Sequence, residues 1–132
     1  MLKSNVVVFV IALGIFALAQ FALLHTYLYW RYPNVDIPMH FLGGVIIALG
    51  IFAARDLHLP VFGSLTTTPR ALGFLFCIAV VWEWLEYLYG HSVVGKSGFV
   101  FDTVTDLILG VAGGFLGLYV ARNLEKLDHD NT

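Results

Sequence analysis

Four long stretches of the chain are almost free of charged residues, and short polar segments separate them. The stretches cover about residues 5–29, 36–54, 71–90 and 102–121. Each is close to the ~20 residues that a helix needs to cross a hydrocarbon core about 30 Å thick. A helix of a soluble protein would instead carry charge along one face, because that face meets water. The pattern predicts an all-α integral membrane four-helix bundle that forms a single domain over residues 1–132.

The composition supports the same class of protein. Hydrophobic residues make up 59% of the chain and charged residues 12%, which is too apolar for an ordinary soluble domain of 132 residues. The formal net charge is −2, so the chain lacks the basic surface that nucleic acid requires, and no nucleic-acid partner is expected. Membrane lipid is the expected partner, and the sequence gives no indication of an oligomeric state.

The first stretch also has features of a cleaved signal peptide. Lys3 supplies a positive start, and the segment Ala17-Leu18-Ala19 resembles a cleavage site. The apolar run, however, continues past Gln20 as far as Trp30, which is longer than a signal peptide needs. We therefore expect a retained membrane span.

The distribution of Lys and Arg predicts the orientation. Four spans place both termini on one side of the membrane, and five basic residues belong to that side against two on the other. The five are Lys3, Arg55, Arg70, Arg122 and Lys126, and the two are Arg31 and Lys96. Because cytoplasmic segments carry the excess of Lys and Arg, we expect cytoplasmic termini, with the protein in the cytoplasmic (inner) membrane. Residues 91–101 are then expected outside.

Several ionisable residues interrupt the apolar stretches, and all fall near the outer ends of their spans. They are His40, Glu83, Glu86 and Asp106, with Asp36 and Asp102 at the mouths of two helices. An ionisable side chain within a span costs roughly 2.5–3.5 kcal/mol, so such residues tend to face the interior of the bundle and to mark function. At 1.5 Å per residue they all fall in one layer beneath the outer surface.

Small residues on the same helical faces favour convergence of these groups. His40 shares a face with Gly43 and Gly44, at i+3 and i+4. Asp106 shares a face with a row of glycines: Gly110, Gly113 and Gly117. Because small residues mark the faces on which membrane helices approach closely, the polar groups are expected to meet inside the bundle.

Four neighbouring carboxylates need compensation, because they could not all ionise side by side. They could be protonated, Lys96 or Arg31 could reach them, or a divalent cation could lie among them. One imidazole with several carboxylates suits Zn²⁺, Mn²⁺, Mg²⁺ or Ca²⁺. The cation hypothesis assigns the ligands His40, Glu83, Glu86, Asp102 and Asp106.

Each of these residues also has a purely structural interpretation. Asp36 and Asp102 are well placed to cap the helices that follow them. His40 could form a hydrogen bond across the bundle, and Glu83 and Glu86 could be protonated groups that hold helices together. The pattern Gly90-x4-Gly95-Lys96-Ser97 matches a nucleotide-binding loop, but such a loop follows a strand rather than a membrane helix, so no nucleotide is expected.

Three polar segments carry a family resemblance. DIPMHFLGG, WEWLEYLYG and FDTVTDLILGVAGG, in this order, resemble the VanZ-like membrane proteins and the related YjdF-type family. The matching positions are Asp36, His40, Phe41, Glu83, Glu86, Asp102, Asp106 and Gly110. The segment Gly95-Lys96-Ser97-Gly98 resembles the G-R-S-G of VanZ-like chains, which gives Lys96 and Ser97, with Asp36, a supporting role. The resemblance implies a bacterial-type envelope protein with an outward site, and no particular reaction.

Two functions fit these features. In the first, the acidic site holds a cation and recognises the head group of a lipid or of a cell-envelope precursor. In the second, the chain is a metal-dependent hydrolase of a phosphate- or ester-bearing lipid, in which the ion activates water and a carboxylate accepts its proton. A proton or ion pathway is less well supported, because the inner half of every span is apolar.

Overall fold

Four long helices dominate the protein. The structure is a computed structural model that describes residues 3–89 and 99–130, and no strand occurs among these residues. The long helices are α1 (Ser4–His25), α3 (Asp36–Asp56), α5 (Thr68–Tyr89) and α6 (Phe99–Asp130), and the short ones are α2 (Leu28–Arg31) and α4 (Pro60–Gly63). The all-α fold predicted from the sequence is confirmed.

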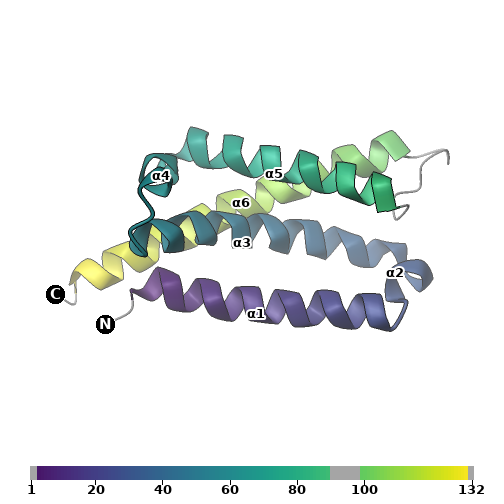
Figure 1. Ribbon diagram of the computed structural model, residues 1–132, viewed down its shortest axis with the longest axis horizontal. Coiled ribbons are helices and arrows are strands. Elements are labelled where there is room, and N and C mark those ends of the chain that lie inside the picture. Colours follow the sequence, from purple (N-terminus) through teal and green to yellow (C-terminus); the bar gives the residue numbers. More distant parts are fainter. Residues whose placement is uncertain (1–2, 90–98, 131–132) are drawn as a thin grey trace.

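Helix α3 lies at the centre of the bundle. It packs against α1 and α6, and α5 packs against α6. In Figure 1, α1 and α5 lie on opposite sides of α3, and α6 crosses behind it. Both chain ends lie at the same end of the bundle, which we call the terminal end, and the opposite end is the distal end.

The outer surface of the four long helices is mostly apolar. Large side chains such as Leu18, Phe21, Ile108 and Tyr119 are more than half exposed. A surface of this kind would cause association in water, whereas in a bilayer it faces the lipid. Each of the four long helices is long and apolar enough to span a membrane. The protein is therefore a membrane protein with four membrane-spanning helices.

The first span is shorter than predicted. Helix α1 ends at His25, and Tyr27 adopts a left-handed backbone conformation with a φ of 57° that redirects the chain into α2. The Thr26 hydroxyl donates a hydrogen bond of 2.6 Å to the Ala22 carbonyl and closes the last turn. Hydropathy alone does not reveal this turn, because the apolar residues continue through it.

The last helix is longer than predicted, since α6 continues to Asp130 instead of ending near residue 121. Its polar end is held by contacts with two other helices. The Asp128 carboxylate accepts hydrogen bonds from the backbone N–H of Ser4, at 3.0 Å, and from the Ser4 hydroxyl. Glu125 forms an ion pair with Arg55. The polar tail is therefore part of the bundle.

Helices α3 and α6 approach each other at backbone distance. A Cβ at Gly44 would collide with the Gly110 carbonyl, and a Cβ at Gly113 would collide with the carbonyl of Phe41. A Cβ at Gly43, in contrast, would meet no atom within 4 Å. The glycine face predicted for α6 thus does pack closely, whereas the two neighbouring glycines of α3 face different surroundings.

The terminal half of the bundle holds the apolar core. It consists of Ala48, Leu49, Ile51, Phe52, Ala71, Leu118 and Ala121, each at most 2% exposed. Next to it, the side chain of Asp56 is 1% exposed and lies in a polar network. Asp56 accepts hydrogen bonds from Arg55 Nη2 at 2.6 Å and Lys3 Nζ at 3.3 Å, and Asn5 Nδ2 donates at 3.5 Å. This network ties α1 to α3, and the sequence analysis did not single out Asn5 or Asp56.

Candidate functional site

Five polar side chains from three helices meet near the distal end of the bundle. We call this cluster the polar layer, and its members are Asp36 and His40 of α3, Glu83 and Glu86 of α5, and Asp106 of α6. Each comes from the part of its helix that lies toward the distal end. The close approach of α3 and α6 at their glycines brings Asp106 to the face of α3 that carries His40.

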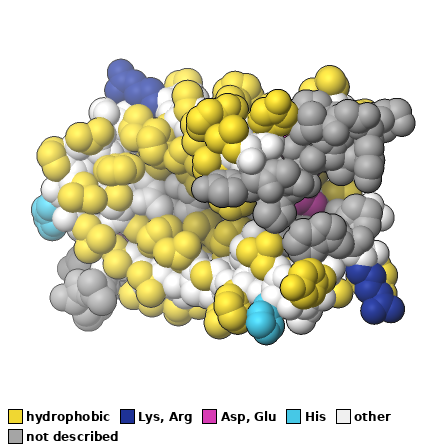
Figure 2. All heavy atoms as spheres, turned by 45° about the vertical axis from the view of Figure 1, so that its right-hand side comes forward, with side chains coloured by type: hydrophobic (Ala, Val, Ile, Leu, Met, Phe, Trp, Pro, Cys, Tyr) yellow, Lys and Arg dark blue, Asp and Glu magenta, His cyan; other side chains and the backbone are white. Residues whose placement is uncertain are grey.

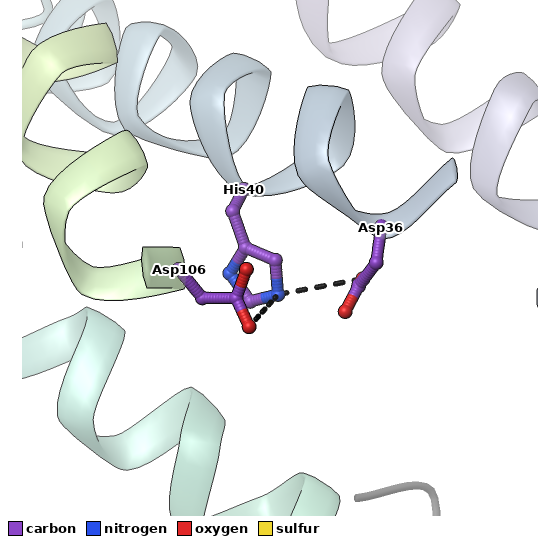
Figure 3. Close-up of side chains that lie close together, drawn as sticks. All are labelled: Asp36, His40 and Asp106. Atoms are coloured by element: carbon purple, nitrogen blue, oxygen red, sulfur yellow. Dashed lines mark ion pairs between the residues drawn. The ribbon is translucent and has the colours of Figure 1, made fainter. Parts of the chain in front are cut away.

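His40 is the centre of the polar layer. Its Nε2 lies 3.4 Å from Asp36 Oδ1 and 3.8 Å from Asp106 Oδ2, as Figure 3 shows. Its Nδ1 lies 3.8 Å from Glu83 Oε1. The imidazole is thus surrounded by carboxylates from all three helices. Its side chain is 8% exposed, so water contributes little to its solvation.

Asp36 belongs to the polar layer and does not cap α3. Val35 occupies the N-cap position and makes no side-chain capping hydrogen bond, whereas Asp36 is the first helical residue. At that position its carboxylate lies one turn from His40 and faces it. The capping interpretation of Asp36 is therefore wrong, and its carboxylate is one of the groups that surround His40.

Asp102 does not join the cluster. It is exposed in the first turn of α6, and it belongs to neither group of side chains whose ligand atoms come close enough to share an ion. Because α6 begins at Phe99, Asp102 is not an N-cap either. It lies one turn nearer the helix start than Asp106. Lys96, Ser97 and the nucleotide-loop pattern from Gly90 to Ser97 lie outside the described residues.

Glu86 is held by an aromatic residue of its own helix. The indole Nε1 of Trp82 donates a hydrogen bond of 2.7 Å to Glu86 Oε1, one helical turn away. This contact orients the carboxylate. The sequence did contain a signal for this contact: Trp82 and Glu86 are four residues apart on one helix, and i and i+4 side chains are neighbours.

Two buried atoms of the polar layer have no hydrogen-bond partner. They are Nε2 of His40 and Oε1 of Glu83. Polar atoms inside proteins are almost always satisfied, so each such atom needs an explanation, and an ion that belongs to the site is one. The carboxylates add negative charge in a membrane interior, where uncompensated charge is costly.

Two groups of ligand atoms within the polar layer have the spacing of a metal site. One is Asp36, His40 and Asp106, and the other is His40, Glu83 and Glu86. Within each group, the possible ligand atoms all lie within 4.8 Å of one another. Two carboxylate oxygens and one imidazole nitrogen form a donor set for borderline to hard divalent cations. The residues present therefore fit such an ion.

A cavity of about 250 Å³ adjoins the polar layer and lies between α1, α3 and α5. Asp36, His40 and Glu86 line one part of it, and the rest of the wall is almost entirely apolar. Glu83 and Asp106 are not among its lining residues. The polar layer therefore has a side that faces the cavity and a side that is enclosed between helices.

Comparison with known proteins gives a family and no activity. The sequence model of a family described as predicted membrane protein (DUF2238) matches residues 3–126, and the chain belongs to this family. The match supports the membrane location, and the description of the family assigns no reaction, ligand or metal. No curated protein and no solved structure matches the chain.

Proposed function

We propose that this member of the DUF2238 family of predicted membrane proteins binds a divalent cation in its polar layer and uses the site to recognise the head group of a membrane lipid or envelope precursor. The observation that carries the proposal is the position of His40. Its buried Nε2 has no hydrogen-bond partner and lies between the carboxylates of Asp36 and Asp106.

The distances around Nε2 favour a shared ion over direct hydrogen bonds. At 3.4 and 3.8 Å, both contacts exceed the 2.7–3.2 Å typical of N–H···O bonds. Ligand atoms lie about 2.0–2.6 Å from Zn²⁺ or Ca²⁺, so two ligands of one ion are roughly 3–4 Å apart. A modest inward movement of the three side chains would complete the coordination.

The location of the site supports an envelope role. Both termini lie at the end opposite the polar layer (Figure 1), and the excess of Lys and Arg belongs to the terminal end. By the positive-inside rule the termini are cytoplasmic and the polar layer lies near the extracytoplasmic leaflet of the inner membrane. The resemblance to VanZ-like and YjdF-type proteins agrees with a site directed toward the envelope.

Elemental analysis of the purified protein tests the cation. We expect a bound divalent ion that chelator removes, and a melting temperature that falls with chelator and recovers when the ion is returned. His40→Gln should lose the ion, whereas His25→Gln, which changes an exposed imidazole at the end of α1, should keep it. The proposal would be refuted if the purified protein contained no metal and its melting temperature changed neither with chelator nor with added Zn²⁺, Mn²⁺, Mg²⁺ or Ca²⁺.

The cavity favours a second function, that of a metal-dependent lipid hydrolase. Such an enzyme needs a path by which a lipid reaches the ion, and the cavity gives access to Asp36 and His40. The ion would activate water for attack on a phosphate or carboxyl ester, and a carboxylate of the polar layer would accept the proton. Release of product from phospholipid vesicles by the metal-loaded protein, and not by His40→Gln, distinguishes this function from binding alone.

A further inference from the structure

We propose that the cavity between α1, α3 and α5 binds a single-chain amphiphile with a positively charged amine head group. The amine would lie against Glu86 with Asp36 beside it, and the hydrocarbon tail would run along the apolar wall. This inference rests on the head-group recognition proposed above, names the class of ligand, and does not require the divalent cation.

The cavity changes from polar to apolar along the bundle axis on all three helices. On α1 Gln20 lies nearer the distal end than Leu13, on α3 Asp36 lies nearer than Ile47, and on α5 Glu86 lies nearer than Leu75. From Glu86 to Leu75 the helix rises about 16 Å, at 1.5 Å per residue. The lining is therefore arranged like an amphiphile, with a head region at one end and a tail region at the other.

The tail region is large enough for a hydrocarbon chain. Its wall includes Leu13 and Phe16 of α1, Ile47 of α3, and Leu75 and Ile78 of α5. The cavity volume of about 250 Å³ exceeds the ~150 Å³ of an apolar protein cavity that takes up benzene. Burial of an alkyl chain against these side chains supplies the non-directional part of the affinity.

The charge of the head region selects a cation. Asp36 and Glu86 line the cavity, and no Lys or Arg is among its described lining residues. An anionic head group would be repelled there, whereas an ammonium group adds positive charge next to the two carboxylates. Trp82 also lines the cavity, and an aromatic ring next to a carboxylate is a common recognition site for ammonium groups. The hydrogen bond from Trp82 to Glu86 holds the carboxylate in place before the ligand arrives.

His40 also lines the cavity, and it is the one imidazole among the four carboxylates of the polar layer. Its side chain is 8% exposed, and its Nε2 makes no hydrogen bond at 3.4 Å from Asp36 and 3.8 Å from Asp106. One imidazole offsets at most one negative charge, so carboxylates remain in excess. The ammonium group of a primary amine supplies further positive charge and three hydrogen-bond donors for their oxygens.

The amphiphile can enter from the membrane without crossing water. Figure 2 shows a face of the bundle that is mostly hydrophobic, with part of an acidic side chain visible on it. Most of the residues that line the cavity belong to α1, α3 and α5, which places it on the face where α1 and α5 flank α3 (Figure 1). This face meets the acyl chains of the bilayer, so a lipid-soluble tail reaches the cavity laterally.

Gly43 allows the cavity to be filled without harm to the packing. It lines the cavity, and a Cβ there would meet no atom within 4 Å. Gly43→Leu should place its side chain in the tail region. Gly14→Leu on α1 is the matched control, because its Cβ also meets no atom within 4 Å and Gly14 does not line the cavity.

The test uses a tetradecylamine with a terminal trifluoromethyl group, added to the protein in phosphatidylglycerol nanodiscs that contain chelator. Fluorine NMR should show a bound signal for the amine with the wild type and with Gly14→Leu, and none with Gly43→Leu. Glu86→Gln should weaken binding about tenfold or more, since a charged hydrogen bond is lost. The alcohol and the carboxylic acid of equal length should bind far more weakly.

Equal binding of amine and alcohol, or full binding by Gly43→Leu, would overturn the proposal. Asp106→Asn separates it from the cation site, because Asp106 does not line the cavity. That variant should lose the divalent ion and keep the amine, whereas Gly43→Leu should lose the amine and keep the ion. An amine that fails to bind the wild type in chelator, although elemental analysis finds the ion in protein purified without chelator, would reject this inference alone.

Discussion

Gly113 of α6 lies against the backbone carbonyl of Phe41 in α3, so closely that a Cβ at Gly113 would occupy the space of the carbonyl oxygen. Phe41 follows His40 in the chain, and Asp106 lies two turns before Gly113 on the same helix. The backbone contact therefore sets the separation of the two helices at the depth where the polar layer assembles.

Replacement of Gly113 by Leu should destabilise the bundle. Overpacking of a well-packed interior costs about 1–3 kcal/mol even when side chains can move, and here the clash is with backbone. We expect the melting temperature in detergent to fall by about 5 °C or more. Gly117→Leu should act in the same direction, because a Cβ there would lie 2.5 Å from the Val45 carbonyl oxygen. Gly73→Leu, at a position open to the surroundings, is the control, and a melting temperature equal to that of the control would contradict the prediction.

Neutralisation of Asp106 should show whether a bound cation or a proton compensates the negative charge of the polar layer. If a divalent cation binds there, Asp106→Asn removes a ligand, and both ion content and melting temperature should fall. If the carboxyl is protonated instead, the amide imitates the protonated acid, and stability should hold or rise. The measurement is the melting temperature of the variant and of the wild type, with and without chelator.

Asp102→Asn is the matched control for this experiment. It makes the same chemical change one turn away on the same helix, at an exposed position outside both ligand groups. We expect its ion content and melting temperature to equal those of the wild type. A loss of ion as large as that of Asp106→Asn would show that the coordination extends to the start of α6.

The orientation of the bundle can be tested with cysteine labelling. In a Cys77→Ser background, Asn34→Cys lies in the distal connection before α3, and Asp130→Cys lies at the end of α6. Both positions are exposed. In intact bacterial spheroplasts, a membrane-impermeant maleimide should label Asn34→Cys and should label Asp130→Cys only after lysis. The reverse pattern would place the polar layer on the cytoplasmic side.

Removal of the Asp56 carboxylate should loosen the terminal end. Loss of one partner of a buried ion pair costs about 3–5 kcal/mol, but Lys3 and Arg55 are partly exposed and regain some hydration. We therefore expect Asp56→Asn to lower the free energy of unfolding by about 1–3 kcal/mol. Asp130→Asn, at an exposed position, should have no measurable effect. If both variants unfold at the same temperature, the network around Asp56 contributes no stability.

The four spans could be predicted from the sequence because a bilayer imposes both a length and a lack of charge on each helix. The same reasoning predicted the ends of the helices less well. The turn at Tyr27 lies within an apolar run, and the end of α6 is stabilised by contacts with Ser4 and Arg55, which are distant in sequence.

Depth along the helix axis indicated most of the polar layer, since His40, Glu83, Glu86 and Asp106 fall at similar distances from the ends of their spans. Asp102 was included because it lies at the mouth of the same span, one turn from Asp106, but in the bundle it is exposed and outside both groups of ligand atoms. The cavity could not be predicted from the sequence either, because the separation of α1 from α5 is set by three-dimensional packing and leaves no periodic pattern in the sequence.

The contact between Ser4 and Asp128 has a consequence for biosynthesis. The two residues are 124 positions apart: Ser4 is the first residue of α1, and Asp128 lies near the end of α6. During translation Ser4 leaves the ribosome early, whereas Asp128 is added only after the residues of all four spans have been joined. The terminal end of the bundle can therefore close only after elongation has passed Asp128, and until then the backbone N–H and hydroxyl of Ser4 must bind lipid head groups, water or the insertion machinery.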